Sequence, residues 1–367
     1  MRVRFGRDQQ LHRVSGLGAA RHPDAPRRSL TRRAALGLLT AGAAAGPYLI
    51  RQARAATPLA VRLDWSPHAM HCGFHLAAES GFFKKAGLDV QVEDGNGSTT
   101  TVQVVGAGKF DVGHAALAPM AIAKAAGMPV ISVAGFLRTG DMGFLVDRKL
   151  KVTKLEDLEG HSIDYTAGSL EGPFVQPFFA LNHIPVDKIK LLNVDASAKM
   201  SSYVSGAVDG MITSVPSYYV LVADKRPVDM ILFADYGLNL PGFGLVTRPE
   251  VLKEKGDAVR RLASVLCSTW TYIWNGRQDE AARAFLAQRP NSGMSKQQVL
   301  DSLEVYKPFF WSKATKTTPI GVQDAGDWTA TIAQMEVAKV VPPGSKPSDY
   351  FTNGYIDYSF GNQIVGV

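Results

Sequence analysis

The feature that most constrains the fold is an alternation of short apolar runs and helical stretches that occurs twice along the chain. The predicted strands and helices of the two series are 59–63, 73–80, 88–93 and 98–106, followed later by 162–165, 172–182, 188–193, 198–205 and 211–214. Alternation of this kind is typical of a mostly parallel sheet covered by helices. We therefore expect an α/β protein with two similar units.

A short motif recurs in the two series. Gly108–Gly113 reads Gly-Lys-Phe-Asp-Val-Gly, and Gly206–Met211 reads Gly-Ala-Val-Asp-Gly-Met. In both copies a glycine ends a predicted helix and a short apolar strand follows. The recurrence favours two lobes of similar construction with a cleft between them.

The chain also has to return from the second unit to the first. Apolar strands are predicted at 143–146, 230–234 and 242–247, so two extended connections would form a hinge and make the first lobe discontinuous. The expected division is 56–145 for the first part of lobe 1, 146–236 for lobe 2, and 237–367 for the return to lobe 1 with C-terminal helices. These helices are predicted at 249–255, 257–274, 279–288, 295–309 and 324–337, and their Trp270, Trp274, Trp311 and Trp328 are interpreted as packing residues.

The positive charge is confined to one segment. Residues 1–55 contain eleven Arg and two acids, which gives 11 − 2 = +9, whereas 29 bases and 31 acids from Ala56 onward give 29 − 31 = −2. The formal charge of +7 therefore does not describe the folded part. We expect no nucleic-acid partner, because the remainder lacks a basic surface composition.

The basic segment resembles a twin-arginine export signal. Arg32-Arg33 precedes a Gly/Ala-rich apolar run at 34–50, and Ala53-Arg54-Ala55 is a small-x-small cleavage site. The alternative is a membrane anchor, but the run is diluted by glycine, interrupted by Pro47 and short of the about 20 apolar residues that span a bilayer. We expect cleavage after Ala55 and a periplasmic protein.

Two cysteines, Cys72 and Cys267, are present. An oxidising compartment permits a disulfide between them. Lone cysteines are more often small buried apolar residues, so we expect two free thiols.

The most informative segment follows the first predicted strand, where an open α/β sheet places its ligand. There Trp65 offers a flat apolar wall, while Asp64, His68 and His71 offer polar groups. A metal site is the alternative, because His71 and His75 would share a helix face. We do not predict one, since no zincin pattern or carboxylate run completes the set.

Other loops supply further candidates for ligand binding. Ser98 and Thr99 follow the second strand, and Ser98 is predicted to cap the next helix. Their counterparts in the second lobe are Tyr165, Gly168 and Ser169. The remaining candidates follow other strands and are His114, Thr139, Asp141, Ser214 and Tyr218. No catalytic residue is predicted, because the chain lacks a Gly-x-Ser-x-Gly elbow, a phosphate loop and a dinucleotide fingerprint.

Several motifs occur in a characteristic order. They are Asp64-Trp65-Ser66-Pro67, Gly81-Phe82-Phe83, Ala86-Gly87-Leu88, Gly108 to Gly113, Gly127-Met128-Pro129-Val130 and Leu155 to Gly160. As an ordered set, over about 58–340, they resemble the ABC-transporter solute-binding proteins that handle nitrate, sulfonates, taurine, bicarbonate and thiamine pyrimidine precursors. Asp64, Trp65 and His71 look most like the members for pyrimidine-type ligands.

The resemblance implies a type II periplasmic-binding-protein fold, with two Rossmann-like lobes joined by a two-strand hinge. It implies capture of a small organic molecule, pyrimidine-like, aromatic or of sulfonate type, and its delivery to an ABC permease. We expect a monomer with no cofactor and no metal.

An exported enzyme and a metal carrier are the alternatives. The same superfamily includes a eukaryotic pyrimidine synthase that uses pyridoxal phosphate on a lysine two residues after the glycine equivalent to Gly113. Ala115 occupies that position here, and 238–243 lacks the synthase's cysteine cluster. Both differences argue against the enzyme.

Overall fold

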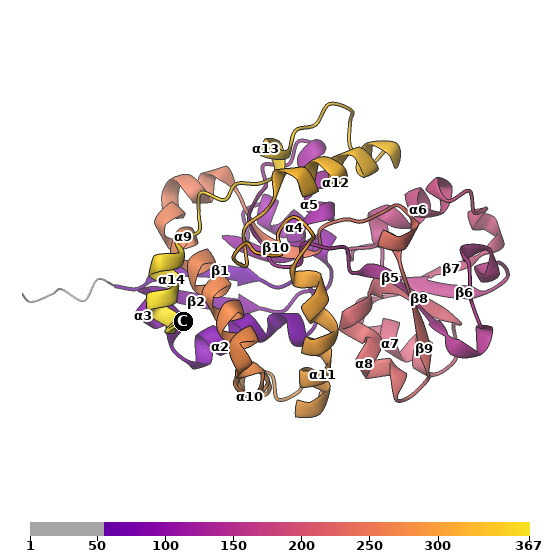
Figure 1. The fold of residues 1–367 in the computed structure, drawn as a ribbon, viewed down its shortest axis with the longest axis horizontal. Helices are drawn as coiled ribbons and strands as arrows, with labels where there is room; N and C mark the ends of the chain where they lie inside the picture. The colour runs from indigo at the N-terminus through magenta and orange to yellow at the C-terminus, as the bar shows by residue number, and fades with distance from the viewer. Residues whose placement is uncertain (1–54) are drawn as a thin grey trace, which may run out of the picture. The chain divides into compact units, whose positions relative to one another are not determined.

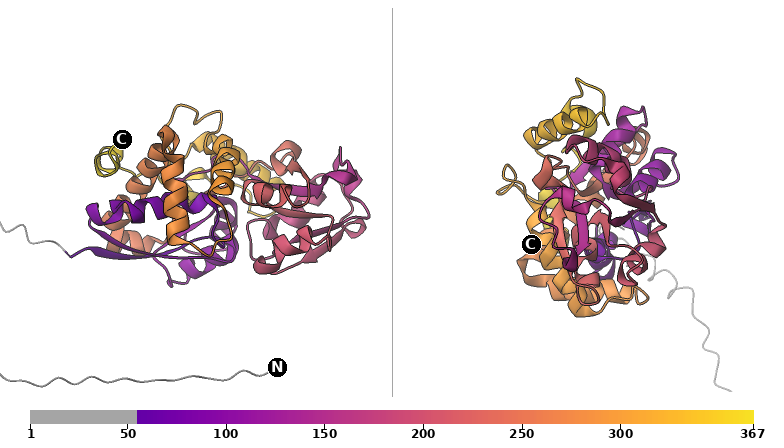
Figure 2. Two further views of the ribbon diagram at one scale, coloured as in Figure 1. Left: turned by 90° about the horizontal axis from the view of Figure 1, so that it is seen from below. Right: turned by 90° about the vertical axis from the view of Figure 1, so that its right-hand side faces the viewer.

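The computed structural model describes residues 55–367. The predicted export signal lies outside the described residues except for Ala55. These residues form one compact unit that contains two five-stranded sheets. Figures 1 and 2 show each sheet with its own covering helices. None of the helices in 55–367 is long and apolar enough to cross a membrane.

The first sheet has the strand order β2-β1-β3-β10-β4. Its strands are β1 (Thr57–Arg62), β2 (Leu88–Glu93), β3 (Val112–Ala116), β4 (Ile131–Gly135) and β10 (Phe243–Thr247). β1 pairs in parallel with both β2 and β3, whereas β10 runs antiparallel between β3 and β4. A strand from late in the sequence thus completes the sheet, as the predicted return to lobe 1 requires.

The second sheet repeats this construction with the order β7-β6-β8-β5-β9. Its strands are β5 (Met142–Asp147), β6 (Ser162–Tyr165), β7 (Lys190–Asn193), β8 (Gly210–Ser214) and β9 (Val228–Leu232). β6 is parallel to β7 and β8, and β5 is antiparallel to β8 and β9. The two α/β units predicted from the sequence are confirmed.

The recurring motif has the same structural role in both sheets. Asp111 precedes β3, and its carboxylate accepts a hydrogen bond of 2.9 Å from the backbone N–H of Ala60 on β1. Asp209 precedes β8 and accepts one of 2.9 Å from the N–H of Ser162 on β6. Gly108 and Gly206 have φ near +83° and +82°, a conformation that favours glycine. Each aspartate therefore fixes the register of a central strand.

Two connections run between the sheets, from β4 to β5 and from β9 back to β10. They are joined by hydrogen bonds from Gly242 N to Leu137 O (3.0 Å) and from Gly140 N to Asn239 Oδ1 (2.8 Å). β5 begins at Met142, so residues up to 145 that were expected in lobe 1 already pair in the second sheet. Each connection is flanked by a strand of the first sheet and a strand of the second.

The helices cover the sheets and extend the first lobe. They are α2 (Cys72–Glu79), α3 (Phe82–Lys85), α4 (Ser98–Gly106), α5 (Leu117–Ala125), α6 (Val175–Leu181), α7 (Ala196–Val204), α8 (Val215–Ala223), α9 (Pro249–Tyr272), α10 (Gln278–Gln288), α11 (Lys296–Tyr306), α12 (Ala325–Val337), α13 (Pro347–Tyr350) and α14 (Tyr358–Val365). α9 merges two predicted helices and is kinked at Lys255. The yellow α14 packs against it in Figure 1.

Buried aromatic residues fill the core of the first lobe. Trp270 and Trp328 are almost fully buried, as expected of packing residues, while Trp274 and Trp311 are half-buried against the same core. Cys72 and Cys267 are both buried free thiols. Burial raises the pKa of each thiol, that of Cys267 to about 12, so both behave as apolar groups at neutral pH.

Candidate functional site

The loop after β1 is held by the loop after β2. Gly97 donates its backbone N–H to the carbonyl oxygen of Asp64 at 2.6 Å, and Gly95 donates to that of Trp65 at 3.0 Å. A Cβ atom at Gly95 would lie 2.1 Å from the carbonyl oxygen of Leu63, so only glycine permits this close approach. The two loops thereby fix Asp64 and Trp65 at the carboxyl edge of the sheet.

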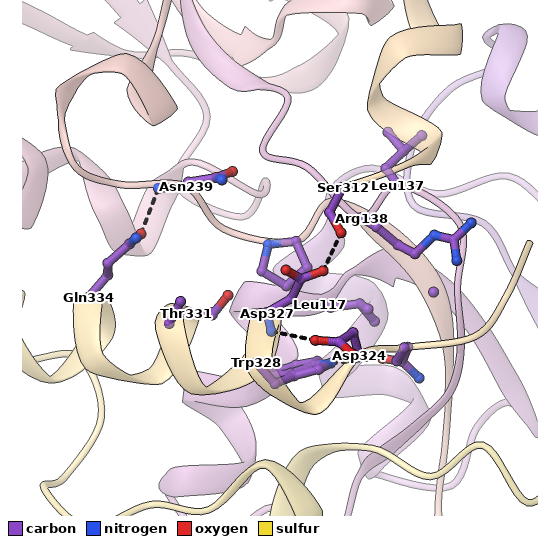
Figure 3. Close-up of a pocket in the computed structure, with 14 residues that line it drawn as sticks. Leu117, Leu137, Arg138, Asn239, Ser312, Asp324, Asp327, Trp328, Thr331 and Gln334 are labelled. Carbon is purple, nitrogen blue, oxygen red and sulfur yellow. Dashed lines mark hydrogen bonds between the residues drawn. The ribbon is translucent and has the colours of Figure 1, made fainter. Parts of the chain in front are cut away.

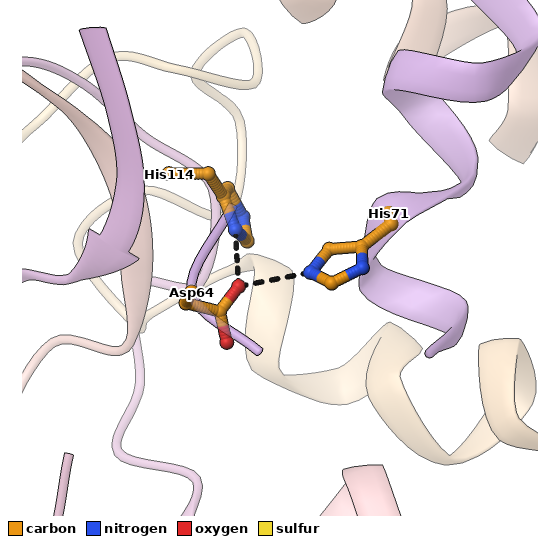
Figure 4. A group of neighbouring side chains, drawn as sticks. All are labelled: Asp64, His71 and His114. Carbon is orange, nitrogen blue, oxygen red and sulfur yellow. Dashed lines mark hydrogen bonds and ion pairs between the residues drawn. The ribbon is translucent and has the colours of Figure 1, made fainter. Parts of the chain in front are cut away.

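Asp64 is buried among three imidazoles, two of which are shown with it in Figure 4. Its Oδ1 lies 2.7 Å from Nδ1 of His114 and 3.0 Å from Nε2 of His71, and its Oδ2 lies 3.4 Å from Nε2 of His68. Burial alone would raise the pKa of Asp64. The nearby His68 and the hydrogen bonds with His114 and His71 outweigh burial and hold the pKa of this carboxyl well below its usual range.

The His71 ring is fully buried within this cluster. Burial, with the nearby His68, lowers its pKa well below the usual range. His75 does not join the cluster, because its ring packs against Phe285 at 5.5 Å. Burial lowers the pKa of His75 to about 3. The helix-face pair of His71 and His75 considered from the sequence is therefore not formed, and His114 from β3 approaches Asp64 instead.

Trp65 connects the two lobes. Its indole Nε1 donates a hydrogen bond of 2.8 Å to the hydroxyl oxygen of Tyr218 on α8, and the indole belongs to the apolar cluster of the second lobe. Both residues line two neighbouring cavities. The inner cavity, with an empty volume of about 230 Å³, is lined by Asp64, Trp65, Ser169, Leu170, Thr213, Ser214, Ser217, Tyr218 and Phe243.

The outer cavity shares this aromatic pair with the inner one and has an empty volume of about 540 Å³. It is lined by Trp65, Ser66, Pro67, His68, Ala196, Ser197, Met200, Ser217, Tyr218, Leu221 and Ser292. Both lobes contribute to both cavities. The inner cavity is lined by buried residues, whereas Ser66 and Ser197 of the outer cavity are exposed, and the hydrogen-bonded pair lies in the wall of both.

A chain of hydrogen bonds crosses the cleft beside the aromatic pair. The Tyr306 hydroxyl lies 3.1 Å from Nδ1 of His68 and also contacts the hydroxyl of Ser217. Ser217 donates to Ser214 at 2.9 Å, and Ser214 donates to the carboxylate of Asp141. Burial raises the pKa of Asp141 to about 6, although the Ser214 hydrogen bond opposes that shift. The chain links the first lobe, the second lobe and a hinge residue.

A buried ion pair lies on the second-lobe side of Trp65. The Lys199 ammonium contacts the Glu171 carboxylate, and both side chains are almost fully buried. Lys199 Nζ also lies 5.7 Å from the centre of the Trp65 ring, within range of a cation–π interaction. Glu171 in turn accepts the backbone N–H of Thr166 at 2.9 Å. This pair supports the loop 166–171 and the indole together.

The loops of the two lobes also meet through their backbones. Thr99 donates its hydroxyl to the carbonyl oxygen of Ser169 at 2.8 Å, and Thr100 donates its N–H to that of Gly168 at 3.2 Å. Gly97 has a φ of +149°, and a Cβ there would lie 2.0 Å from the Gly168 carbonyl oxygen. The two lobes are thus in contact where residues 97–100 meet residues 168–169. Gly97 lies closest to the other lobe, where a larger residue would clash.

The structure brings together part of the predicted set. Asp64, Trp65, Ser169, Ser214 and Tyr218 line the inner cavity, and His68 lines the outer one. The candidates that line neither cavity are His71, Ser98, Thr99, His114, Thr139, Asp141, Tyr165 and Gly168.

Several of these serve a structural contact instead. Ser98 is the first residue of α4, not its cap, which is Gly97. Its hydroxyl oxygen accepts the N–H of Ala116 at 3.1 Å. The Thr139 hydroxyl donates to the carbonyl oxygen of Trp311 at 3.1 Å, so it joins the hinge to the C-terminal part of lobe 1.

Sequence reasoning missed four of the residues that line the inner cavity, which are Leu170, Thr213, Ser217 and Phe243. Thr213 and Ser217 flank the predicted Ser214, so their proximity along the chain was an available signal. Phe243 reaches the cleft only because β10 returns to the first sheet beside β3. No local pattern in the sequence marks that position.

Another cavity lies within the first lobe, behind the hinge (Figure 3). Its walls include Trp328 and Thr331 of α12, with Arg138 and Asn239 from the two connections. No residue of the second sheet lines it. We place the candidate site in the cleft, because a ligand there would contact both lobes.

The chain was compared with known proteins. The model of the family described as NMT1/THI5 like matches residues 68–280, more than half of the chain. The formylaminopyrimidine-binding protein of Halalkalibacterium halodurans is 22% identical over 287 residues, which cover 75% of this chain and 84% of that protein. A 4-amino-5-hydroxymethyl-2-methylpyrimidine phosphate synthase of Saccharomyces cerevisiae is 34% identical, but over only 104 residues, 28% of this chain and 31% of the synthase.

The fold is also similar to solved structures. That of the alkanesulfonate-binding protein from Xanthomonas axonopodis pv. citri, bound to MOPS, has a TM-score of 0.63 at 16% identity and covers 81% of this chain and 98% of that one. This likeness confirms the periplasmic-binding-protein fold predicted from the sequence. The protein belongs to the NMT1/THI5-like family.

Proposed function

We propose that the protein is the exported solute-binding component of an ABC importer and captures a small organic molecule in the cleft. The observation that carries the proposal is the pairing of Trp65 and Tyr218 across two lobes, with Asp64 beside them in the inner cavity. Ligand contacts to both lobes stabilise a closed form, and an inner-membrane permease would recognise that form. The protein acts as a periplasmic monomer after removal of residues 1–55.

The lining favours a flat heterocycle that donates hydrogen bonds. Trp65, Tyr218 and Phe243 supply aromatic surfaces, and Asp64 supplies an anionic acceptor. No Lys or Arg is among the described residues that line the inner cavity, so a small sulfonate would have no counter-ion there. An aminopyrimidine fits these groups, in agreement with the ligand named for the Halalkalibacterium relative.

Calorimetry tests the proposal directly. We expect 4-amino-5-hydroxymethyl-2-methylpyrimidine to bind and to be recovered unchanged, and MOPS to bind more weakly. Trp65→Ala should weaken pyrimidine binding by about 2 kcal/mol or more, because the ring forms a wall of the site. Trp274→Phe is the matched control, since Trp274 packs against Phe310, away from the cleft.

Binding of neither probe, or unchanged affinity in Trp65→Ala, would contradict the proposal. Conversion of the pyrimidine would instead support the enzyme alternative. Two observations argue against that outcome. The similarity to the synthase covers only 104 residues, 28% of this chain, and Ala115 stands where the synthase has its lysine.

A further inference from the structure

We propose that the residues around Asp64 form a binding site for a divalent transition-metal ion at the base of the cleft. The donor atoms are Asp64 Oδ1, His71 Nε2 and His114 Nδ1, which all lie within 4.8 Å of one another. Two imidazoles and one carboxylate are a donor set that suits ions such as Zn²⁺, Co²⁺ and Fe²⁺. The ion is a resident group of this cleft, distinct from the organic cargo.

The donors come from separate parts of the chain and are held in place before any ion arrives. Asp64 is fixed by the loop contacts of its backbone, and His71 lies in the turn (Ala69–His71) that leads into α2. The His114 ring stacks on Phe243 at 5.1 Å and on Phe136 at 6.0 Å. Figure 4 shows the two rings converging on one carboxylate oxygen. Such preorganisation favours metal binding, since little conformational freedom is lost.

A third imidazole nitrogen is directed at the same carboxylate. His68 Nε2 lies 3.4 Å from Asp64 Oδ2 and has no hydrogen-bond partner, although only 3% of His68 is exposed. Tyr306 fixes the orientation of this ring through Nδ1. His68 is therefore available as an additional donor on the side of the cleft, where it lines the outer cavity.

The charge balance also favours a cation. Among the ion pairs of residues 55–367, the partners of Asp64 are three histidines, with no Lys or Arg. A buried carboxylate without a permanent counter-charge is costly, and a divalent ion would supply that charge.

The site connects to the cleft through Asp64, which lines the inner cavity while His71 and His114 do not. An ion would therefore enter when the lobes separate and would be covered when they close. His75, on α2, provides an internal control, because it is also a buried histidine but packs on Phe285.

Titration of the EDTA-treated protein with Co²⁺ tests the inference, with visible absorption and calorimetry as readouts. We expect one ion per chain and ligand-field bands typical of nitrogen and oxygen donors. His71→Phe and His114→Phe, which keep an aromatic ring in the core, should weaken Co²⁺ binding by more than about 100-fold. His75→Phe should bind as the unaltered protein does.

Crystals grown with Zn²⁺ give a second readout that needs no variant. An anomalous peak between Asp64, His71 and His114 is expected. Absence of that peak, or equal Co²⁺ affinity in His71→Phe and the unaltered protein, would overturn the inference. Pyrimidine binding is measured separately with EDTA present, so failure of the metal site and failure of the transport proposal give different results.

Discussion

The indole nitrogen of Trp65 and the hydroxyl oxygen of Tyr218 lie 2.8 Å apart, one residue following β1 and the other on α8. This hydrogen bond joins the two lobes, together with the backbone contacts of Thr99 and Thr100 with the loop 168–169. Both residues also belong to the linings of the inner and the outer cavity. The pair is therefore placed to couple closure of the lobes to occupancy of the inner cavity.

Tyr218→Phe should reduce affinity for the pyrimidine by about 2- to 10-fold. The substitution removes only the hydroxyl, and one such hydrogen bond contributes about 0.5–1.5 kcal/mol to the closed form. Calorimetry gives the affinity, and small-angle scattering shows whether the free protein becomes more open. Tyr219→Phe is the matched control, because this neighbouring tyrosine lines neither cavity. Equal losses in both variants would contradict a specific role for Tyr218.

Gly97→Ala should prevent full closure and weaken ligand binding more than Tyr218→Phe does. The new Cβ would meet the carbonyl oxygen of Gly168 in the other lobe at 2.0 Å. Gly127→Ala is the control, because Gly127 also has a positive φ, of +92°, but a Cβ added there would meet no atom within 4 Å. If backbone strain at a positive φ were the only effect, both variants would lose affinity. If the new Cβ blocks closure of the lobes, only Gly97→Ala loses affinity for the ligand.

Glu171→Gln should destabilise the protein by about 3–5 kcal/mol, because it leaves the ammonium of Lys199 buried without its partner. Urea unfolding gives the free energy. The exposed pair of Lys188 and Glu159 provides the comparison, and Glu159→Gln should cost less than about 1 kcal/mol. If the two substitutions lowered the free energy of unfolding by similar amounts, the prediction that the Lys199 ammonium stays buried without a partner would be contradicted.

Stability should fall as pH rises through about 6, in part because of Asp141. Burial raises the pKa of this carboxyl to about 6, above the usual 3.8, so the native state holds a proton that the unfolded state has released. The contribution is complete below the unfolded pKa and is lost as pH rises through the folded one. Asp141→Asn should flatten the dependence of Tm on pH between about 4 and 6, whereas Asp89→Asn, at an exposed site, should not. An unchanged slope in Asp141→Asn would contradict the assignment.

The sequence indicated the two sheets well, because their strands are short apolar runs between clear helix signals. β2 and β6 begin and end at the predicted residues, and the Gly-x-x-Asp motif marks equivalent positions through Asp111 and Asp209. The boundary between the two lobes was predicted less accurately. The sequence of β5 is apolar, and this composition does not indicate which of the two sheets the strand joins. Its pairing with β8 and β9 depends on contacts distant in the sequence.

The site was predicted where it depends on one loop and missed where it depends on tertiary contacts. Asp64, Trp65 and His68 follow directly from the end of β1. His71 and His75 share a helical spacing, but the local turn directs His71 toward Asp64 and leaves His75 in the core. Phe243 reaches the cleft from a strand that returns late in the chain, a placement that no local pattern specifies.

The most direct measurement is a crystal structure of the protein grown with 4-amino-5-hydroxymethyl-2-methylpyrimidine. We expect the ring to lie in the inner cavity against Trp65, with Asp64 and Ser214 within hydrogen-bond distance and both sheets in contact with the ligand. A ligand bound only in the cavity behind the hinge (Figure 3), or one that touches a single lobe, would contradict capture between the lobes.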